Sequence, residues 1–185
     1  IEDQVFPKKC GHFAGKDVIP LGEMVQKVKA AVDARRDQDL QVIARTDARA
    51  VEGLDGAIAR AHAYIEAGAD VAFVEAPTSL AELARVTREI KAPHVANIVF
   101  GGKTPDPGQV ELAKMGFSLV LYANAALQAA VKAAMDVLGV LKRDGSLDGV
   151  RGQLVSFEER QRVVQKPTWD ALEAKFQAAS GKGAT

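Results

Sequence analysis

The sequence predicts an α/β protein with parallel strands, and within that class a portion of a (β/α)₈ barrel. Short apolar runs alternate with helical patterns along most of the chain, which is typical of parallel strands covered by helices. Polar residues end successive runs, as they do at the mouth of a barrel. These residues are Glu2, Arg45 with Asp47, Glu75, Asn97, and Tyr122 with Asn124.

The predicted elements follow one another in a regular order. A loop over residues 5–20 precedes a helical pattern over 21–36, in which apolar residues recur every three or four positions. The strand-like runs and the helical patterns that follow them lie at 40–45 and 54–67, 71–75 and 80–90, 94–97 and 107–114, and 119–122 and 125–141. No G-x-G-x-x-G turn follows any of these runs, so a barrel is favoured over a dinucleotide-binding doubly wound sheet.

Five strand ends are fewer than the eight of a complete barrel, so we expect about three β/α units, roughly 100 residues, to be missing before residue 1. Residues 1–145 are then the C-terminal part of the barrel. A Gly/Asp/Ser-rich stretch at 144–152 precedes a helical segment over 154–176, which we expect Pro167 to break. Residues 146–185 are predicted to form a C-terminal helical arm that packs on the barrel or on a neighbouring subunit.

Composition narrows the class of partner. The chain has 24 basic and 24 acidic residues and a formal charge of zero, which argues against nucleic acid and against an anionic membrane surface. No apolar run approaches the roughly 20 residues of a membrane span. With nucleic acid and membrane surfaces disfavoured, we expect a small-molecule ligand. One cysteine cannot form an intrachain disulfide, so we expect a reducing, cytoplasmic setting.

That single cysteine, Cys10, stands in the stretch KKCGH. A lone cysteine is often a small buried hydrophobe. Here Lys8 and Lys9 precede it and Gly11 and His12 follow it, which places the thiol on a loop. Neighbouring positive charge favours a thiolate, so Cys10 is a candidate proton donor or nucleophile.

The strand-end residues suit a divalent cation and an anionic substrate. Carboxylate oxygens are the ligands that Mg²⁺ prefers, with Mn²⁺ as its substitute, and an arginine can bind a carboxylate through two hydrogen bonds. Each residue has a plainer structural alternative. Asp3 and Asp47 would equally brace the backbone, and we interpret His62 and His94 as structural because neither ends a strand.

Four motifs together resemble the isocitrate lyase and phosphoenolpyruvate mutase superfamily, over residues 1 to about 176. They are IEDQ followed by FPKKCGH, IARTDA at 43–48, VEAP at 74–77, and ANI at 96–98 with GGKTP at 101–105. The resemblance implies a Mg²⁺-dependent barrel, a mobile gating loop over 5–20 that carries Lys8 and Lys9, and a homotetramer whose last helix swaps between subunits.

The resemblance also implies roles for single residues. The loop cysteine is the catalytic acid in the carbon–carbon lyase branch, which assigns Cys10 that role. Gly11, His12, Arg45, Glu75 and Asn97 would bind the substrate. Glu2 would hold the magnesium through water, with the main aspartate ligands in the missing N-terminal part.

The expected reaction is the retro-aldol cleavage of a 2-alkylmalate to a 2-oxo acid and a carboxylate, as in the 2,3-dimethylmalate lyase and petal-death-protein group. Alternatives are a methylisocitrate or isocitrate lyase, an oxaloacetate hydrolase and a phosphonate mutase. Relatives that bind a tricarboxylate carry arginines where this chain has Gln128 and Phe157, which favours a smaller, partly apolar dicarboxylate. Phe100 replaces a usual glutamate and puts the polar contacts of its loop in doubt. A further alternative is a non-catalytic barrel.

Overall fold

The computed structural model describes residues 1–180. The part of the predicted arm after Ser180 lies outside these residues. The chain divides into two compact units, one over Ile1–Ala125 and the other from Ala126 onward. The predicted domain limit at residue 145 stays a prediction. Over residues 1–180, none of the helices has both the length and the apolar character that a bilayer crossing requires.

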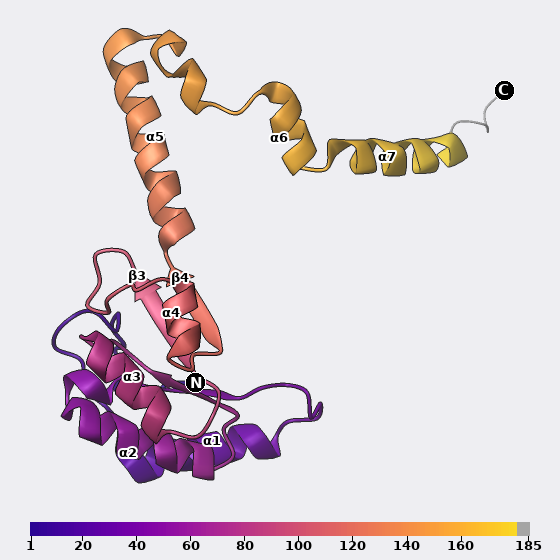
Figure 1. Ribbon diagram of the computed structural model, residues 1–185. Helices are drawn as coiled ribbons and strands as arrows, with labels where there is room; N and C mark the ends of the chain where they lie inside the picture. Colours follow the sequence, from indigo (N-terminus) through magenta and orange to yellow (C-terminus); the bar gives the residue numbers. More distant parts are fainter. Residues whose placement is uncertain (181–185) are drawn as a thin grey trace. The chain divides into compact units, whose positions relative to one another are not determined.

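The first unit is a layer of parallel strands with helices against it (Figure 1). Strands β1 (Ile43–Thr46) and β2 (Val71–Val74) pair in parallel, and so do β3 (Val95–Val99) and β4 (Leu119–Ala123). Parallel bridges join Ala72 to His94 and Glu2 to Arg45. The strand order is therefore residues 1–3, β1, β2, β3 and β4. The predicted parallel α/β class is confirmed, and the described strands do not close a barrel.

The helices of this unit begin and end close to the predicted positions. They are α1 (Leu21–Asp33), α2 (Gly53–Glu66), α3 (Leu80–Glu89) and α4 (Gln109–Lys114), with a short 3₁₀ helix, η1 (Ala48–Ala50), after β1. Helix α3 starts where Ser79 Oγ accepts a hydrogen bond from the Glu82 nitrogen, which satisfies a backbone donor that the helix leaves unpaired. After α2 the chain turns at Gly68 with φ 104°, a left-handed conformation that glycine adopts without strain.

Alternation along the strands separates the core from the site. One face of each strand packs on the helices and is buried in hydrophobic clusters, to which the strands contribute Ala44, Ala72, Val74, Ala96 and Ile98. Burying one medium-sized apolar side chain contributes about 1.5–3 kcal/mol, so these clusters fix the register. Because side chains alternate along a strand, Arg45, Phe73 and Asn97 lie on the opposite face.

His94 is buried just before β3, at the end of the strand away from Glu75 and Asn97. Its Nε2 lies 2.9 Å from the Ile90 carbonyl oxygen, which can only accept, so Nε2 carries the proton. Nδ1 is buried without a partner among the described residues. Burial lowers the pKa of His94 from its ordinary value and outweighs the opposing effect of the Ile90 hydrogen bond. This environment agrees with the structural role expected for His94.

The second unit contains α5 (Ala125–Asp144, whose first residue belongs to the first unit), a 3₁₀ helix η2 (Asp148–Gln153), α6 (Phe157–Val163) and α7 (Lys166–Ser180). The predicted break of the arm near Pro167 is confirmed, because α6 ends at Val163 and α7 begins at Lys166. The break lies at Gln165, which has φ 54°, and Pro167 stands in the first turn of α7, where a missing N–H costs nothing. Many apolar side chains of this unit are exposed, including Leu127, Val131, Met135, Leu138, Phe157, Val163, Trp169 and Phe176.

Candidate active site

The structure brings together four of the predicted strand-end residues, Glu2, Arg45, Glu75 and Asn97. Glu2 lies beside Arg45, with Glu2 Oε2 3.3 Å from Arg45 Nε, and Glu75 Oε2 lies 3.7 Å from Arg45 Nη2. Asn97 Nδ2 donates to both carboxylate oxygens of Glu75 at 3.2 Å. Asn97 Oδ1 is buried and has no partner among the described residues. Residues from four consecutive strands thus meet at the carboxyl ends of those strands.

The guanidinium of Arg45 is fixed by hydrogen bonds to Asp47, which is fully buried. Arg45 Nε donates to Asp47 Oδ2 at 2.9 Å and Nη2 donates to Oδ1 at 3.1 Å, a bidentate pair. Burial alone would lower the pKa of Arg45, but the Asp47 hydrogen bonds and the charges of Glu75, Asp47 and Glu2 outweigh it and raise that pKa above its ordinary value. Arg45 is therefore a fixed cation.

Asp3 fixes Asp47 in turn. Asp3 Oδ1 accepts the backbone N–H of Asp47 at 2.9 Å, and Asp3 Oδ2 accepts the Tyr64 hydroxyl at 2.7 Å. Burial, and then the hydrogen bond to Asp3, raise the pKa of Tyr64 well above its ordinary value. Arg60 Nη1 lies 3.5 Å from Asp3 and also donates to the Ile19 carbonyl. Asp3 and Asp47 thus brace the structure, the plainer of the two roles considered for them.

The KKCGH loop is packed into the mouth formed by these residues. A Cβ atom added to Gly11 would lie 2.3 Å from Glu75 Cγ, so only glycine allows this approach. His12 Nε2 lies 3.2 Å from Glu75 Oε1, and His12 Nδ1 accepts the backbone N–H of Lys103 at 2.9 Å. Since Nδ1 accepts, Nε2 carries a proton; it is buried close to the Glu75 carboxylate but makes no hydrogen bond within the described residues.

Cys10 is exposed on this loop. The Phe13 amide donates to the Cys10 carbonyl at 2.9 Å, which closes a turn over residues 10–13. The two flanking cations are directed elsewhere, because Lys8 Nζ lies 3.1 Å from Glu2 Oε1 and Lys9 Nζ donates to the Gly15 carbonyl. Within residues 1–180 no polar contact joins the sulfur to Arg45 or to Glu75. The catalytic role of Cys10 stays a prediction.

Two residues that sequence reasoning missed, Gln4 just before the loop and Lys16 within it, also fix the loop. Gln4 holds the Lys9 backbone by a reciprocal pair of hydrogen bonds, both 2.8 Å. Lys16 has a side chain only 2% exposed, and its ammonium lies 3.8 Å from Asp47 Oδ1 and donates to the carbonyls of Gly11 and Phe13. Burial lowers the pKa of Lys16 from its ordinary value, against the opposing charge of Asp47. Nothing in the local sequence distinguishes Lys16 from a solvated lysine.

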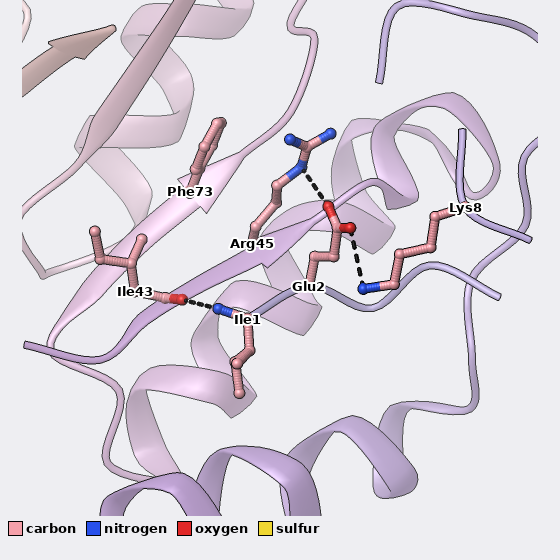
Figure 2. A pocket seen from close by; sticks show the side chains of 6 residues that line it. All are labelled: Ile1, Glu2, Lys8, Ile43, Arg45 and Phe73. Carbon is pink, nitrogen blue, oxygen red and sulfur yellow. Dashed lines mark hydrogen bonds and ion pairs between the residues drawn. The ribbon is translucent and has the colours of Figure 1, made fainter. Parts of the chain in front are cut away.

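A pocket of about 370 Å³ opens beside Arg45, within the size range of small-molecule sites. Figure 2 shows Glu2 between the side chains of Arg45 and Lys8, with an interaction to each. Phe73, with its ring centroid 5.2 Å from Arg45 Cζ, and Ile43 add an apolar wall. Sequence reasoning also missed Phe73, although strand alternation places it on the same face as Glu75. The pocket suits an anionic molecule with an apolar part.

The backbone next to Glu75 is strained. Ala76 has φ 56°, a left-handed conformation that costs a non-glycine residue about 1–2 kcal/mol. Strain of this kind persists where the surrounding structure imposes it, and it concentrates at functional sites. Asn124 has φ 64° as well, but asparagine tolerates this conformation, so its position after β4 is explained by the turn.

The carboxylates present do not form a complete metal site. Within residues 1–180 there is no group of three or more His, Cys, Asp and Glu side chains arranged to hold a metal ion. Glu75 is occupied by His12 and Asn97, whereas Glu2 lines the open pocket. Glu2 is therefore placed to contact a water molecule bound to a cation. It cannot form a metal site by itself.

Residues 1–141 match the family described as phosphoenolpyruvate phosphomutase. The chain belongs to this family. It is 42% identical to the petal death protein of Dianthus caryophyllus over 95% of this chain and 55% of that protein. It is 43% identical to the 2,3-dimethylmalate lyase of Eubacterium barkeri over 86% of this chain and 55% of that protein, and 48% identical to the 2-methylisocitrate lyase of Bacillus subtilis (strain 168) over 94% and 57%. The chain thus spans about half the length of these curated relatives.

Solved structures agree with this membership. A crystal structure of 2,3-dimethylmalate lyase, described as a PEP mutase/isocitrate lyase superfamily member, matches with a TM-score of 0.88 and 35% identity over 100% of this chain and 62% of that one. Oxaloacetate acetylhydrolase in complex with 3,3-difluorooxalacetate matches with a TM-score of 0.86 and 30% identity, over 100% and 61%. Phosphonopyruvate hydrolase in complex with oxalate and Mg²⁺ matches with a TM-score of 0.80 and 30% identity, over 96% and 62%. The predicted superfamily is confirmed.

Proposed function

We propose that this chain belongs to a Mg²⁺-dependent carbon–carbon lyase that cleaves a 2-alkylmalate, such as 2,3-dimethylmalate, to a 2-oxo acid and a carboxylate. The observation that carries the proposal is Arg45, a half-buried cation fixed by Asp47 at the wall of a pocket that is also lined by Phe73. A guanidinium held in this way is ready to bind a carboxylate without reorganising. The apolar wall suits an alkyl substituent.

Cleavage breaks the C2–C3 bond of the malate skeleton. The hydroxyl at C2 gives its proton to a general base as that carbon becomes the carbonyl of the 2-oxo acid, and the bonding electron pair remains on C3, next to the second carboxylate. We propose that the Cys10 thiol gives its proton to C3, while Arg45 stabilises negative charge on the departing oxygens. A bound Mg²⁺ would add positive charge at the 2-oxo acid, with Glu2 facing its water.

Glu75 and Asn97 position the substrate in this proposal. The two hydrogen bonds from Asn97 Nδ2 to Glu75 fix the amide, so that Asn97 Oδ1 is a buried acceptor without a partner among residues 1–180. A substrate hydroxyl can satisfy it. Gly11 and His12 lie directly over Glu75, so the loop covers this part of the site and excludes water from it.

Replacing Cys10 with serine tests the role of the thiol, because serine is similar in size but its hydroxyl is a much weaker acid than a thiol. We expect Cys10→Ser to abolish cleavage of dimethylmalate, measured as 2-oxo acid formation with Mg²⁺, and to leave the thermal unfolding midpoint unchanged. Full activity in this variant would refute the proposed acid.

The substrate is tested by assaying the same protein on 2,3-dimethylmalate, methylisocitrate, oxaloacetate and phosphonopyruvate. We expect dimethylmalate to give the highest kcat/KM. Similarity to 2-methylisocitrate lyases is an argument for methylisocitrate as the substrate. Against it, the resemblance described above places Gln128 and Phe157 where a third carboxylate would need arginines. Preference for methylisocitrate would overturn that argument, and preference for phosphonopyruvate would replace the lyase with phosphonate chemistry.

A non-catalytic barrel is distinguished by ligand-linked stability. Oxalate mimics the enolate of pyruvate, and a ligand that binds only the folded state raises the unfolding midpoint. We expect oxalate with Mg²⁺ to raise the midpoint and oxalate without metal to raise it little. No effect of oxalate under either condition would favour the non-catalytic class.

We also infer that the exposed apolar side chains of α5, α6 and α7 are covered in a homotetramer by exchange of helices between subunits, as the resemblance implies. Sedimentation of the purified protein measures the assembly directly, and a monomer at micromolar concentration would contradict it. The predicted cytoplasmic location stays a prediction.

A further inference from the structure

Lys16 is a buried cation that no part of the proposed reaction uses. Its side chain is 2% exposed, although it lies in a loop whose other lysines, Lys8 and Lys9, are exposed. Burying an ammonium is unfavourable unless its donors are satisfied by hydrogen bonds or an ion pair. The environment of Lys16 is therefore built for this side chain.

All of the partners of Lys16 belong to the site or to its loop. The ammonium has three N–H donors. It donates to the Gly11 carbonyl and, at 3.3 Å, to the Phe13 carbonyl, which lie on either side of His12. It also lies 3.8 Å from Asp47 Oδ1, next to the end of β1. Lys16 thus joins the tip of the loop to the strand layer.

The carboxylate that Lys16 reaches is the one that fixes Arg45. Asp47 Oδ1 accepts from Arg45 Nη2 at 3.1 Å, so one oxygen atom faces both the cation of the loop and the cation of the pocket. A loop that moved away would remove one of the two positive charges around Asp47. The position of the loop and the position of Arg45 are therefore energetically linked through this oxygen.

We propose that Lys16 is a positioning residue that holds the Cys10 loop against the carboxyl ends of the strands and links the placement of the loop to that of Arg45 through Asp47. This inference rests on the proposed function for its catalytic consequence. It differs from the roles of the KKCGH residues themselves, because Lys16 acts on the substrate only through Gly11, Phe13 and Asp47.

Hydrogen exchange of the loop amides tests the tether without relying on activity. Within the loop, the Lys9 amide donates to Gln4 and the Phe13 amide to Cys10, while the Ile19 amide at the base donates to Asp3. We expect Lys16→Met, which keeps length and removes charge, to speed exchange at Lys9 and Phe13 about tenfold and to leave Ile19 unchanged.

Two further variants control this measurement. Lys114→Met removes a lysine from an exposed ion pair with Glu111 and should leave loop exchange unchanged. Lys16→Arg keeps the charge and should restore part of the protection and part of kcat/KM. Wild-type exchange at Phe13 in Lys16→Met would overturn the proposal. Equal acceleration at Ile19 and in β1 would overturn it too, because it would show a general structural role.

A double-mutant cycle tests the link through Asp47. We expect Asp47→Asn to loosen the loop, and the double variant Lys16→Met/Asp47→Asn to loosen it no further than Lys16→Met alone. Additive effects would refute the link. If the wild-type protein cleaves none of the four candidate substrates, the proposed function fails, yet the exchange data still decide whether Lys16 holds the loop.

Discussion

Gly11 offers the sharpest test of whether the loop must dock on Glu75. A Cβ on Gly11 would lie 2.3 Å from both Cγ and Oε1 of Glu75 and 2.5 Å from Cδ. Contacts this short do not occur, so either Glu75 or the loop must move. Glu75 is only 1% exposed and is held by Asn97, His12 and Arg45. The loop is the part that yields.

The magnitude follows from these contacts. Forcing one extra methyl group into a packed region costs about 1–3 kcal/mol. If the loop undocks instead, the same free energy appears as a roughly 5- to 150-fold loss of the docked population. Because the strand layer and its helices are not distorted, we expect Gly11→Ala to leave the unfolding midpoint unchanged and to lower kcat/KM for the substituted malate by one to two orders of magnitude.

The measurement is steady-state cleavage beside thermal unfolding, with Gly22→Ala as the matched control. Gly22 lies in the first turn of α1, and a Cβ there meets nothing within 4 Å. The control should keep full activity and should not lose stability, since alanine favours a helix over glycine. Wild-type kcat/KM in Gly11→Ala would refute the requirement for docking against Glu75.

Three further predictions concern the supporting structure. Tyr64→Phe removes the buried donor to Asp3 and should cost about 1–3 kcal/mol in denaturant unfolding; no loss would contradict the bracing role of Asp3. The folded state holds the pKa of His94 below its ordinary 6.5, so unfolding takes up a proton below that pH. The contribution of neutral His94 to the free energy of unfolding is therefore fully present above pH 6.5 and should fall as the pH drops below it. His94→Gln should remove this part of the pH dependence. Arg45→Lys keeps the charge but loses the bidentate pair with Asp47, so kcat/KM should fall at least tenfold with little change in stability; wild-type kcat/KM would contradict the need for a fixed guanidinium.

Periodicity predicts the elements of the first unit because their causes are local. The apolar positions of 21–36 and 80–90 recur at helical spacing, and α1 and α3 form there. The strand-end residues were also predictable, since alternate residues of parallel strands share a face and their carboxyl ends lie along one edge. The same rule would have found Phe73, two residues before Glu75.

Contacts between distant parts of a loop leave no such pattern. Gln4 and Lys9 pair through one side chain and the backbone, and any polar residue near a loop would look the same in sequence. Lys16 is buried only because the chain folds the loop over Asp47, a residue that lies beyond α1 in the sequence. The break near Pro167 was predictable because its cause is local: a proline ends the preceding helix and can begin the next one.

The balance of charges around the site explains why binding of a dicarboxylate should require an added metal cation. Four carboxylates meet at the strand ends, namely Glu2, Asp3, Asp47 and Glu75, and the cations paired with them are Lys8, Lys16, Arg45 and Arg60. Arg60 is shared with Glu52 through two short hydrogen bonds, so the cluster has no surplus positive charge. A dicarboxylate entering this pocket would add two negative charges to a partly buried region. Such a charge is stable there only with a compensating cation, which is why stabilisation by oxalate is expected to depend on Mg²⁺.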